Sequence, residues 1–245
     1  MPLNRHPFPV TAFFEKSVVL TYAIPRTAGE GLISPPFELD CYREHAFLAV
    51  AFVKVRSLRP SIFPSWIGRD FLLAGYRIFV RYRGVDGRRR RGLQILRSET
   101  DRRSMVLLGN MLTNYHYRLT SMEFHQDEDH LRINNSHGLS ISAQEELKVA
   151  LPPHSPFPDW RTARRFAGPM PFTFSSNPAN QTVTTVEGVR EKWDPTPLTI
   201  RQAQVPFIDE CGLGAEGPNP ARLASAFAVT DIPYHWKAGQ TEPWT

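Results

Sequence analysis

The sequence has few cysteines and no long apolar run. Cys41 and Cys211 are its two cysteines, whereas a secreted scaffold held by disulfides carries more of them at closer spacing. We therefore expect free thiols in a reducing compartment, with a single long-range disulfide as the alternative. The first ten residues contain three prolines and no apolar core of signal-peptide length, and the longest uncharged run, 166–186, is broken by prolines. These absences predict a soluble, cytoplasmic protein with no membrane partner.

The short motifs of several common enzyme classes are also absent. The sequence contains no G-x-S-x-G, H-E-x-x-H, Walker loop or C-x-x-C. Residues 212–217 match the dinucleotide pattern G-x-G-x-x-G, but Pro218 and Pro220 follow where a helix must begin. We expect a surface loop there. The cluster His125–His130 has its three acids next to one another in a predicted turn, where side chains diverge, so a solvated hairpin tip is expected. The sequence thus predicts no metal and no cofactor.

Proline is abundant, at 22 of 245 residues, or about 9% against an average of about 5%. Because proline interrupts helices and central strands, we expect many short elements. Alternating or β-branched runs predict strands at 18–24, 47–55, 76–82, 92–97, 117–125, 131–135, 139–142, 170–175, 182–187, 198–207 and 226–236. The main helix is predicted at 101–112, capped by Thr100 or Asp101, with a short helical segment at 159–166. We predict one mainly β (α+β) domain over 1–245, forming a closed or nearly closed antiparallel barrel that leaves few strand edges exposed.

Positive charge is concentrated in one hairpin. The net charge is +5, yet residues 77–103 contain ten arginines and only three acids. Asp86-Gly87 predicts a tight turn, which places Arg88, Arg89, Arg90 and Arg91 at the hairpin tip. A charged tip that discourages edge pairing is one interpretation. Polyanion or nucleic-acid binding through the hairpin 83–103 is the alternative, although Tyr82, the aromatic residue nearest to the arginines, is predicted to face inward.

Four stretches of the sequence together resemble a known family. They are YRIFVRY at 76–82 with LQILRSE at 93–99, GNMLTNYHYRLTSM at 109–122, KWDPTPLTIRQAQV at 192–205, and AVTDIPYHWK at 228–237. Their order and spacing are similar to those of the acetoacetate decarboxylase-like superfamily, in its bacterial branch of uncharacterised proteins. The resemblance implies a cone-shaped antiparallel β-barrel over 17–237 with a closed internal pocket, an N-terminal arm over 1–16 and a tail over 238–245.

The resemblance also identifies what this chain lacks. The decarboxylases carry two adjacent lysines, one of which forms a Schiff base because its neighbour lowers its pKa. The matching positions here are Tyr117 and Arg118. A phenol cannot form an iminium, and a guanidinium is too weak a nucleophile to do so. We therefore expect no Schiff-base decarboxylation, and leave open whether any reaction is catalysed.

The pocket candidates follow from that position. They are Tyr117, Arg118, Tyr115, His116 and Ser121. Neighbouring strand residues point to opposite faces, so Tyr117 and Arg118 cannot both face inward, and Ser121 is expected on the face of Tyr117. We predict an internal pocket for a small organic ligand of the keto- or hydroxy-acid type. A purely structural or oligomer-forming role stays open, as does the oligomeric state.

Overall fold

The structure, a computed structural model, describes residues 6–146 and 149–244. Its strands are β1 (Val10–Pro25), β2 (Glu38–Leu39), β3 (His45–Pro60), β4 (Arg69–Arg83), β5 (Arg89–Thr100), β6 (Tyr117–Leu119), β7 (Met122–Asp127), β8 (His130–Asn135), β9 (Ser140–Glu145), β10 (Phe172–Asn177), β11 (Thr182–Arg190), β12 (Thr196–Gln204), β13 (Arg222–Trp236) and β14 (Gln240–Pro243). Its helices are α1 (Arg26–Glu30), α2 (Arg103–Leu112), α3 (Trp160–Ala167), α4 (Pro206–Glu210) and the 3₁₀ turn η1 (Ser65–Ile67).

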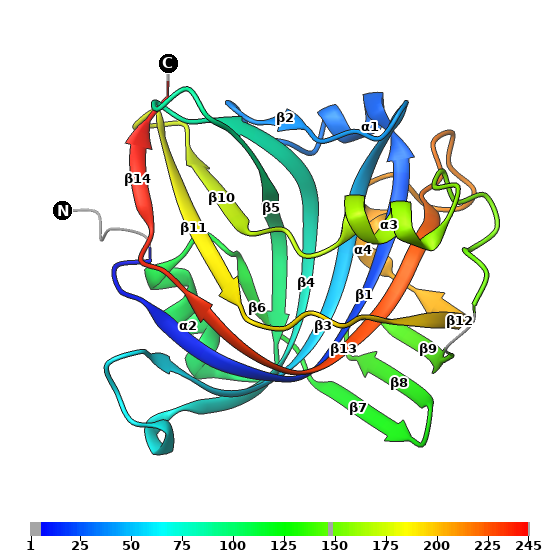
Figure 1. The fold of residues 1–245 in the computed structure, drawn as a ribbon, viewed down its shortest axis with the longest axis horizontal. Coiled ribbons are helices and arrows are strands. Elements are labelled where there is room, and N and C mark those ends of the chain that lie inside the picture. The colour runs from blue at the N-terminus through cyan, green and yellow to red at the C-terminus, as the bar shows by residue number, and fades with distance from the viewer. Residues whose placement is uncertain (1–5, 147–148, 245) are drawn as a thin grey trace.

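Seven strands form a nearly closed ring (Figure 1). Their order is β13, β1, β3, β4, β5, β10 and β11, and the end of β11 pairs with the end of β13. The contact from β5 to β10 is parallel and only three residue pairs long, as is the pairing of β5 with β6. The predicted mainly β, nearly closed barrel is therefore confirmed, with two parallel pairings that alternation in the sequence does not reveal.

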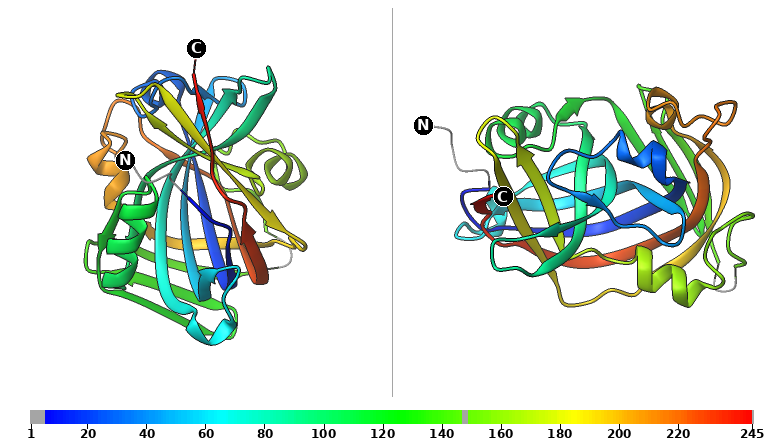
Figure 2. Two further views of the ribbon diagram at one scale, coloured as in Figure 1. Left: turned by 90° about the vertical axis from the view of Figure 1, so that its left-hand side faces the viewer. Right: turned by 90° about the horizontal axis from the view of Figure 1, so that it is seen from above.

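A second sheet packs against the outside of the ring (Figures 1 and 2). It contains β12, β9, β8 and β7, and branches from the ring where Thr196 and Pro197 pair with β13. The main hydrophobic core lies between the two layers. Its largest fully buried side chains include Phe52, Leu48 and Tyr76 from the ring, and Leu131, Ile133 and Ile141 from the second sheet.

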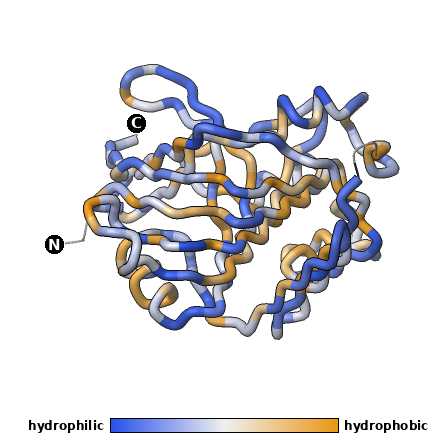
Figure 3. The backbone as a smooth tube through the Cα atoms, turned by 60° about the horizontal axis from the view of Figure 1, so that its bottom comes forward, coloured by the Kyte–Doolittle hydropathy of each residue, from blue (hydrophilic) through white to orange (hydrophobic). Residues whose placement is uncertain are grey.

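The two faces of each ring strand meet different surroundings. In β4 the side chains of Tyr76, Ile78, Val80 and Tyr82 lie in the main core, as their alternation predicts. Arg77 and Phe79 point the opposite way, into the ring. Figure 3 shows hydrophobic segments along the strands and hydrophilic segments at many of the outer loops.

Several predicted boundaries change. The strand expected at 18–24 begins at Val10, so residues 10–16 of the expected arm belong to the ring, and residues 240–243 of the expected tail form β14.

Helix α2 begins at Arg103 without a side-chain cap, because the Asp101 carboxylate instead accepts a hydrogen bond from the backbone N–H of Leu72 at 2.9 Å. Helix α3 does have a side-chain cap, because Asp159 accepts a hydrogen bond from the Thr162 N–H at 2.7 Å.

Two further expectations concern thiols and membranes. Cys41 and Cys211 carry free thiols, as predicted. In the part of the chain that the structure describes, no helix has the length and apolar character needed to cross a membrane.

Candidate functional site

A cavity of about 470 Å³ lies inside the ring, and all seven ring strands contribute to its wall. Side chains from the strands include Ser17, Val19, Ala49, Ala51, Val53, Arg77, Phe79, Ile95, Thr173, Arg190, Phe227 and Tyr234. Helix α2 covers one side through Met105, Leu108 and Leu112. The rim includes Pro7 and Arg69, which are exposed, so the cavity opens to solvent there instead of being closed as the resemblance implied.

The charged side chains of this wall carry one sign. They are Arg59, Arg69, Arg77 and Arg190, and the described lining contains no Asp, Glu or Lys. Arg59 and Arg69 lie near the rim, whereas Arg77 and Arg190 lie on the strands of the ring. An interior of this kind has a positive potential that favours an anion.

Arg77 is the most enclosed cation of the cavity. Its guanidinium folds back over Gly75 on the same strand, where an added Cβ would lie 3.0 Å from Nη2 and 3.2 Å from Cζ. Glycine at this position therefore makes room for the guanidinium. Arg77 keeps some accessible surface because it borders the cavity, yet burial lowers its pKa. Among the described residues no acidic side chain forms an ion pair with it.

Three phenols surround Arg77 and interact with it electrostatically, namely Tyr115, Tyr117 and Tyr234. Burial raises the pKa of Tyr117 to about 12, an effect that the Arg77 charge partly offsets. Burial also raises the pKa of Tyr115. Tyr115 and Tyr117 are therefore protonated at neutral pH and are available as hydrogen-bond donors.

Arg190 differs from Arg77 because it has protein partners. Its Nη1 donates to the Tyr234 hydroxyl at 3.0 Å, and its Nη2 donates to the Met170 carbonyl at 3.2 Å. The guanidinium carbon also lies 5.1 Å from the ring centre of Trp193. These contacts fix Arg190 in the wall, whereas no hydrogen bond holds the Arg77 guanidinium to a described residue.

Several buried polar atoms around the cavity lack a hydrogen-bond partner among the described residues. Ser17 Oγ, Trp193 Nε1, His6 Nε2 and the Tyr115 hydroxyl belong to this group, and all four residues line the cavity. The Thr173 side chain lies near the Tyr115 hydroxyl but outside good hydrogen-bond geometry. Buried polar groups are costly when unpaired, and a polar ligand or water would satisfy them.

The structure separates the predicted pocket candidates into two groups. Tyr115 and Tyr117 line the cavity, and Tyr117 packs on helix α2 at Gly109, where a Cβ would overlap its ring. His116, Arg118 and Ser121 are exposed and lie outside the lining. Tyr117 and Arg118 do point to opposite faces, as expected. Ser121 does not share the face of Tyr117, because β6 ends at Leu119 and the chain leaves the ring.

No described lysine reaches the cavity. Lys16 is buried but faces the second sheet, where its Nζ pairs with Glu145. Lys54 pairs with Glu15 on the outer side of β3, while its neighbours Val53 and Val55 line the cavity. Lys192 and Lys237 are exposed, and Lys148 lies outside the described residues.

The arginine hairpin forms at the Asp86-Gly87 turn, as predicted, and Tyr82 is buried in the core. Its arginines pair with acids of the same chain, which reduces the charge available to a polyanion. Arg88 and Arg90 pair with Asp86, Arg89 pairs with Glu38, and Arg91 pairs with the fully buried Asp40.

The cluster at 125–130 lies on the exposed β7–β8 hairpin, and no group of three metal-ligating side chains occurs within the described residues.

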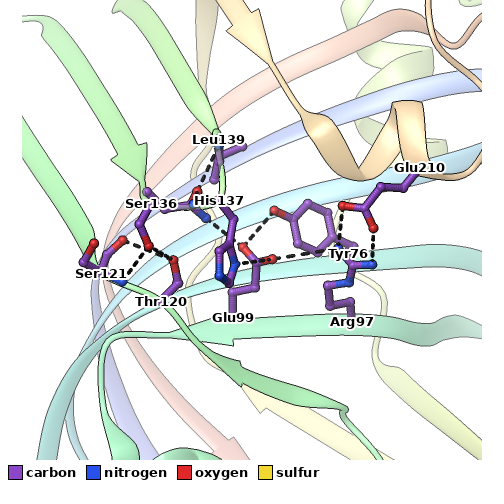
Figure 4. A network of polar contacts seen from close by, with 10 residues as sticks. Tyr76, Arg97, Glu99, Thr120, Ser121, Ser136, His137, Leu139 and Glu210 are labelled. Atoms are coloured by element: carbon purple, nitrogen blue, oxygen red, sulfur yellow. Dashed lines mark hydrogen bonds and ion pairs between the residues drawn. The ribbon is translucent and has the colours of Figure 1, made fainter.

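A second polar cluster lies on the outer face of the ring (Figure 4). At its centre is Glu99, whose side chain is 2% exposed. It accepts hydrogen bonds from the Tyr76 hydroxyl at 3.2 Å and from Asn135 Nδ2 at 2.7 Å, and it lies 3.4 Å from His137 Nδ1. Arg97, 4.0 Å from Glu99, pairs in turn with Glu210 of α4. The cluster thus connects β5, the β8–β9 turn and α4.

Comparisons with solved structures assign the fold. An acetoacetate decarboxylase from Legionella pneumophila superposes with a TM-score of 0.62 at 14% identity, over 98% of this chain and 90% of that one. The enduracididine biosynthesis enzyme MppR, solved with HEPES bound, gives 0.63 at 10% identity over 97% and 88%. An acetoacetate decarboxylase-like enzyme from Sphingomonas wittichii RW1 gives 0.57 at 11% identity over 98% and 94%. The ring with its central cavity is thus the acetoacetate decarboxylase-like fold.

Sequence comparison gives the family. The model of the DUF2071 family, described as an uncharacterized conserved protein, matches residues 11–238. The chain belongs to this family, and the resemblance to an uncharacterised decarboxylase-like branch is confirmed. A comparison with curated proteins finds no match.

Sequence reasoning missed Arg77, Arg190 and Tyr234 as cavity residues. Arg77 had a usable signal, since it is a charged residue at an inward position between buried neighbours in a central strand. Arg190 and Tyr234 had none, because their side chains meet only where β11 pairs with β13, 44 residues apart in sequence.

Proposed function

We propose that this chain binds a small organic anion of the keto- or hydroxy-acid type in the ring cavity, without forming a Schiff base. The observation that carries the proposal is Arg77, an enclosed guanidinium without an acidic partner among the described residues, in a cavity whose described charged side chains are all basic. An uncompensated charge in such a place costs stability. A bound carboxylate would offset that cost.

The geometry suits a 2-oxo or 2-hydroxy acid. The planar guanidinium of Arg77 can hold a carboxylate with two parallel hydrogen bonds. Tyr117 is protonated and lines the same cavity as Arg77, so its hydroxyl can donate to the keto or hydroxyl oxygen of the bound acid. A phenol in this position could act as a general acid if the bound molecule is also converted. MppR, which shares the fold, has been solved in complex with pyruvate.

Thermal shift with a panel of 2-oxo and 2-hydroxy acids tests the proposal. An acid present at 100 times its Kd should stabilise the native chain by about 2.7 kcal/mol, which raises Tm by about 5–11 °C for a chain of this size. Tyr117→Phe should weaken the response, whereas Arg118→Met, at an exposed neighbouring position, should leave it intact. If no acid changes Tm, the proposal is wrong; if Tyr117→Phe responds like the native chain, Tyr117 has no part in binding.

Polyanion binding is a second candidate because of a groove of about 380 Å³ on the surface. The groove is lined by Arg89, Arg90 and Arg91 of the hairpin and by Arg164 and Arg165 of α3. The hairpin arginines pair with acids, whereas Arg164 and Arg165 have no acidic partner among the described residues. Fluorescence anisotropy with labelled DNA and RNA at increasing salt tests this candidate. Reversing the charge of Arg164 and Arg165 should abolish salt-sensitive binding. Unchanged binding in that variant, or none by the native chain, would rule it out.

A further inference from the structure

The cavity is chemically uneven along its length, and this unevenness points to the kind of anion it takes. We infer that its ligand is an amphiphilic carboxylic acid, with the carboxylate at Arg77 and an apolar tail that runs from Arg77 toward the rim. The inference rests on the proposed function, and it adds the substrate class: an acid with a hydrophobic chain or ring system, in place of one with three or four carbons.

The first observation is the order of side chains along β4. The Arg77 guanidinium lies over Gly75, and the next inward residues toward the start of the strand are Leu73 and Phe71, followed by Arg69 at the rim. Gly75 and Phe71 are four positions apart along the strand. This corresponds to a distance of about 13 Å, the length of about ten methylene groups. Beyond the guanidinium, this strand therefore offers an apolar wall of that length.

The neighbouring elements continue the same wall. Val53 and Val55 of β3 lie beside Leu73 and Phe71 in the sheet register, and both line the cavity. Met105 of α2 packs with this group from the other side. The section from Arg77 toward the rim is thus lined mainly by aliphatic and aromatic side chains, and its charged residues, Arg59 and Arg69, lie near the rim.

The second observation is size. A cavity of about 470 Å³ falls in the range of about 300–1,000 Å³ that holds drug-sized ligands. A three-carbon acid would fill the part around Arg77 and leave the apolar section facing water. A tail that fills this section removes apolar surface from water on both the ligand and the protein, which is favourable in proportion to its length.

The rim carries apolar side chains beside Arg59 and Arg69. Leu108 lines the cavity and is 46% exposed, and Leu107, next to it on α2, is 71% exposed. Large exposed apolar side chains are unusual for a soluble chain when they gather at one place. Leu108 borders the opening, beside the apolar section of the cavity, where a hydrophobic tail would pass or end.

Titration calorimetry with a homologous series tests the inference. The probes are 2-oxo acids from pyruvate to 2-oxododecanoate, with 1-octanol as a tail that has no carboxylate. We expect Kd to tighten about fourfold for each added methylene, until the tail reaches the rim. The response should then level off near 2-oxooctanoate or 2-oxodecanoate, and octanol should bind far more weakly than the acid of equal length.

Two variants locate the tail. Leu73→Trp fills the apolar section and should remove the gain from long tails, so that the long acids bind no more tightly than pyruvate. Leu107→Trp is the matched control, because Leu107 lies outside the cavity lining, and it should keep the native chain-length profile. Val55→Phe replaces Leu73→Trp if that variant does not fold, as judged by circular dichroism.

The outcomes separate this inference from the proposed function. Equal affinity for pyruvate and the long acids, or an unchanged profile in the folded Leu73→Trp and Val55→Phe variants, overturns the apolar tail and leaves anion binding standing. If octanol binds as tightly as the acid of equal length, the carboxylate site is wrong and the inference fails with it. If no acid of any length binds, the proposed function is itself wrong.

Discussion

Replacing Arg77 with methionine should make the protein more stable and at the same time unable to bind an anion. Methionine keeps an unbranched side chain of similar reach and removes the charged guanidinium that lies over Gly75 in the ring. In most proteins the loss of an arginine is neutral or destabilising. The opposite sign is expected here because the charge has no acidic partner among the described residues and burial already disfavours its protonated form.

The expected magnitudes follow from the surroundings of the guanidinium. A fully buried ion costs several kcal/mol, and contact with the cavity reduces this cost, so we take about 1–3 kcal/mol for Arg77. At about 2–4 °C per kcal/mol for a chain of this length, Tm should rise by about 2–12 °C. A hydrogen bond to a charged group contributes about 1.5–3 kcal/mol, so the Kd for a carboxylate such as 2-oxooctanoate should weaken by about 10- to 150-fold.

Scanning calorimetry and titration calorimetry measure the two effects on the same variant. Arg190→Met is the contrasting control: it should lower Tm, because Arg190 donates to Tyr234 and to the Met170 carbonyl and packs on Trp193. A lower Tm for Arg77→Met would refute the view of Arg77 as an uncompensated charge. Unchanged affinity for the acid would refute its role in binding.

Three more predictions concern other positions. Gly109→Ala should destabilise the chain by about 1–3 kcal/mol in urea denaturation, although alanine is the better helix former, because its Cβ overlaps the Tyr117 ring; equal or greater stability would contradict this packing. Burial lowers the pKa of His6 to about 4, so the unfolded chain takes up a proton below about pH 6.5 and the folded chain does not. Stability should therefore fall by up to about 3 kcal/mol as the pH falls from 6.5 to 4, and His6→Phe should flatten this slope in urea titrations at several pH values. Glu99→Gln should cost about 1–3 kcal/mol, since two donors lose a charged acceptor; a Tm within 1 °C or so of the native value would show that the cluster adds little.

Sequence patterns predicted the features that depend on local periodicity. The alternation of residues 76–82 correctly assigned the core face of β4, and the 3.6-residue spacing located the helix that ends at Leu112. Asp101 shows where local reasoning fails: it has a capping residue type at a plausible position, but its carboxylate binds the backbone of β4 instead. The backbone N–H of Leu72 binds the Asp101 carboxylate in place of the N–H groups at the start of α2, and the sequence contains no sign of that alternative partner.

The candidate site was predictable only in part, for a similar reason. Tyr115 and Tyr117 were found because they occupy the position of the lysine pair in a resembling family, and both line the cavity. Closure of the ring depends on three residue pairs between β11 and β13, and on three parallel pairs between β5 and β10. Such contacts lie far apart in the chain and have no periodic signal, so the residues that they bring together, above all Arg190 and Tyr234, could not be read from the sequence.

Each ring strand has one face in the core between the two layers and one face toward the cavity. Val50 and Phe52 pack in the core between the two layers, while Ala49, Ala51 and Val53, interleaved with them on the same strand, line the cavity. Ala49 and Val53 also pack in two smaller hydrophobic clusters. Substitution at these three cavity-lining positions changes the cavity wall directly, whereas substitution at Val50 or Phe52 disturbs the core between the layers. A combinatorial library confined to positions 49, 51 and 53 of β3 should therefore yield more folded clones with altered ligand preference than a library at positions 48, 50 and 52.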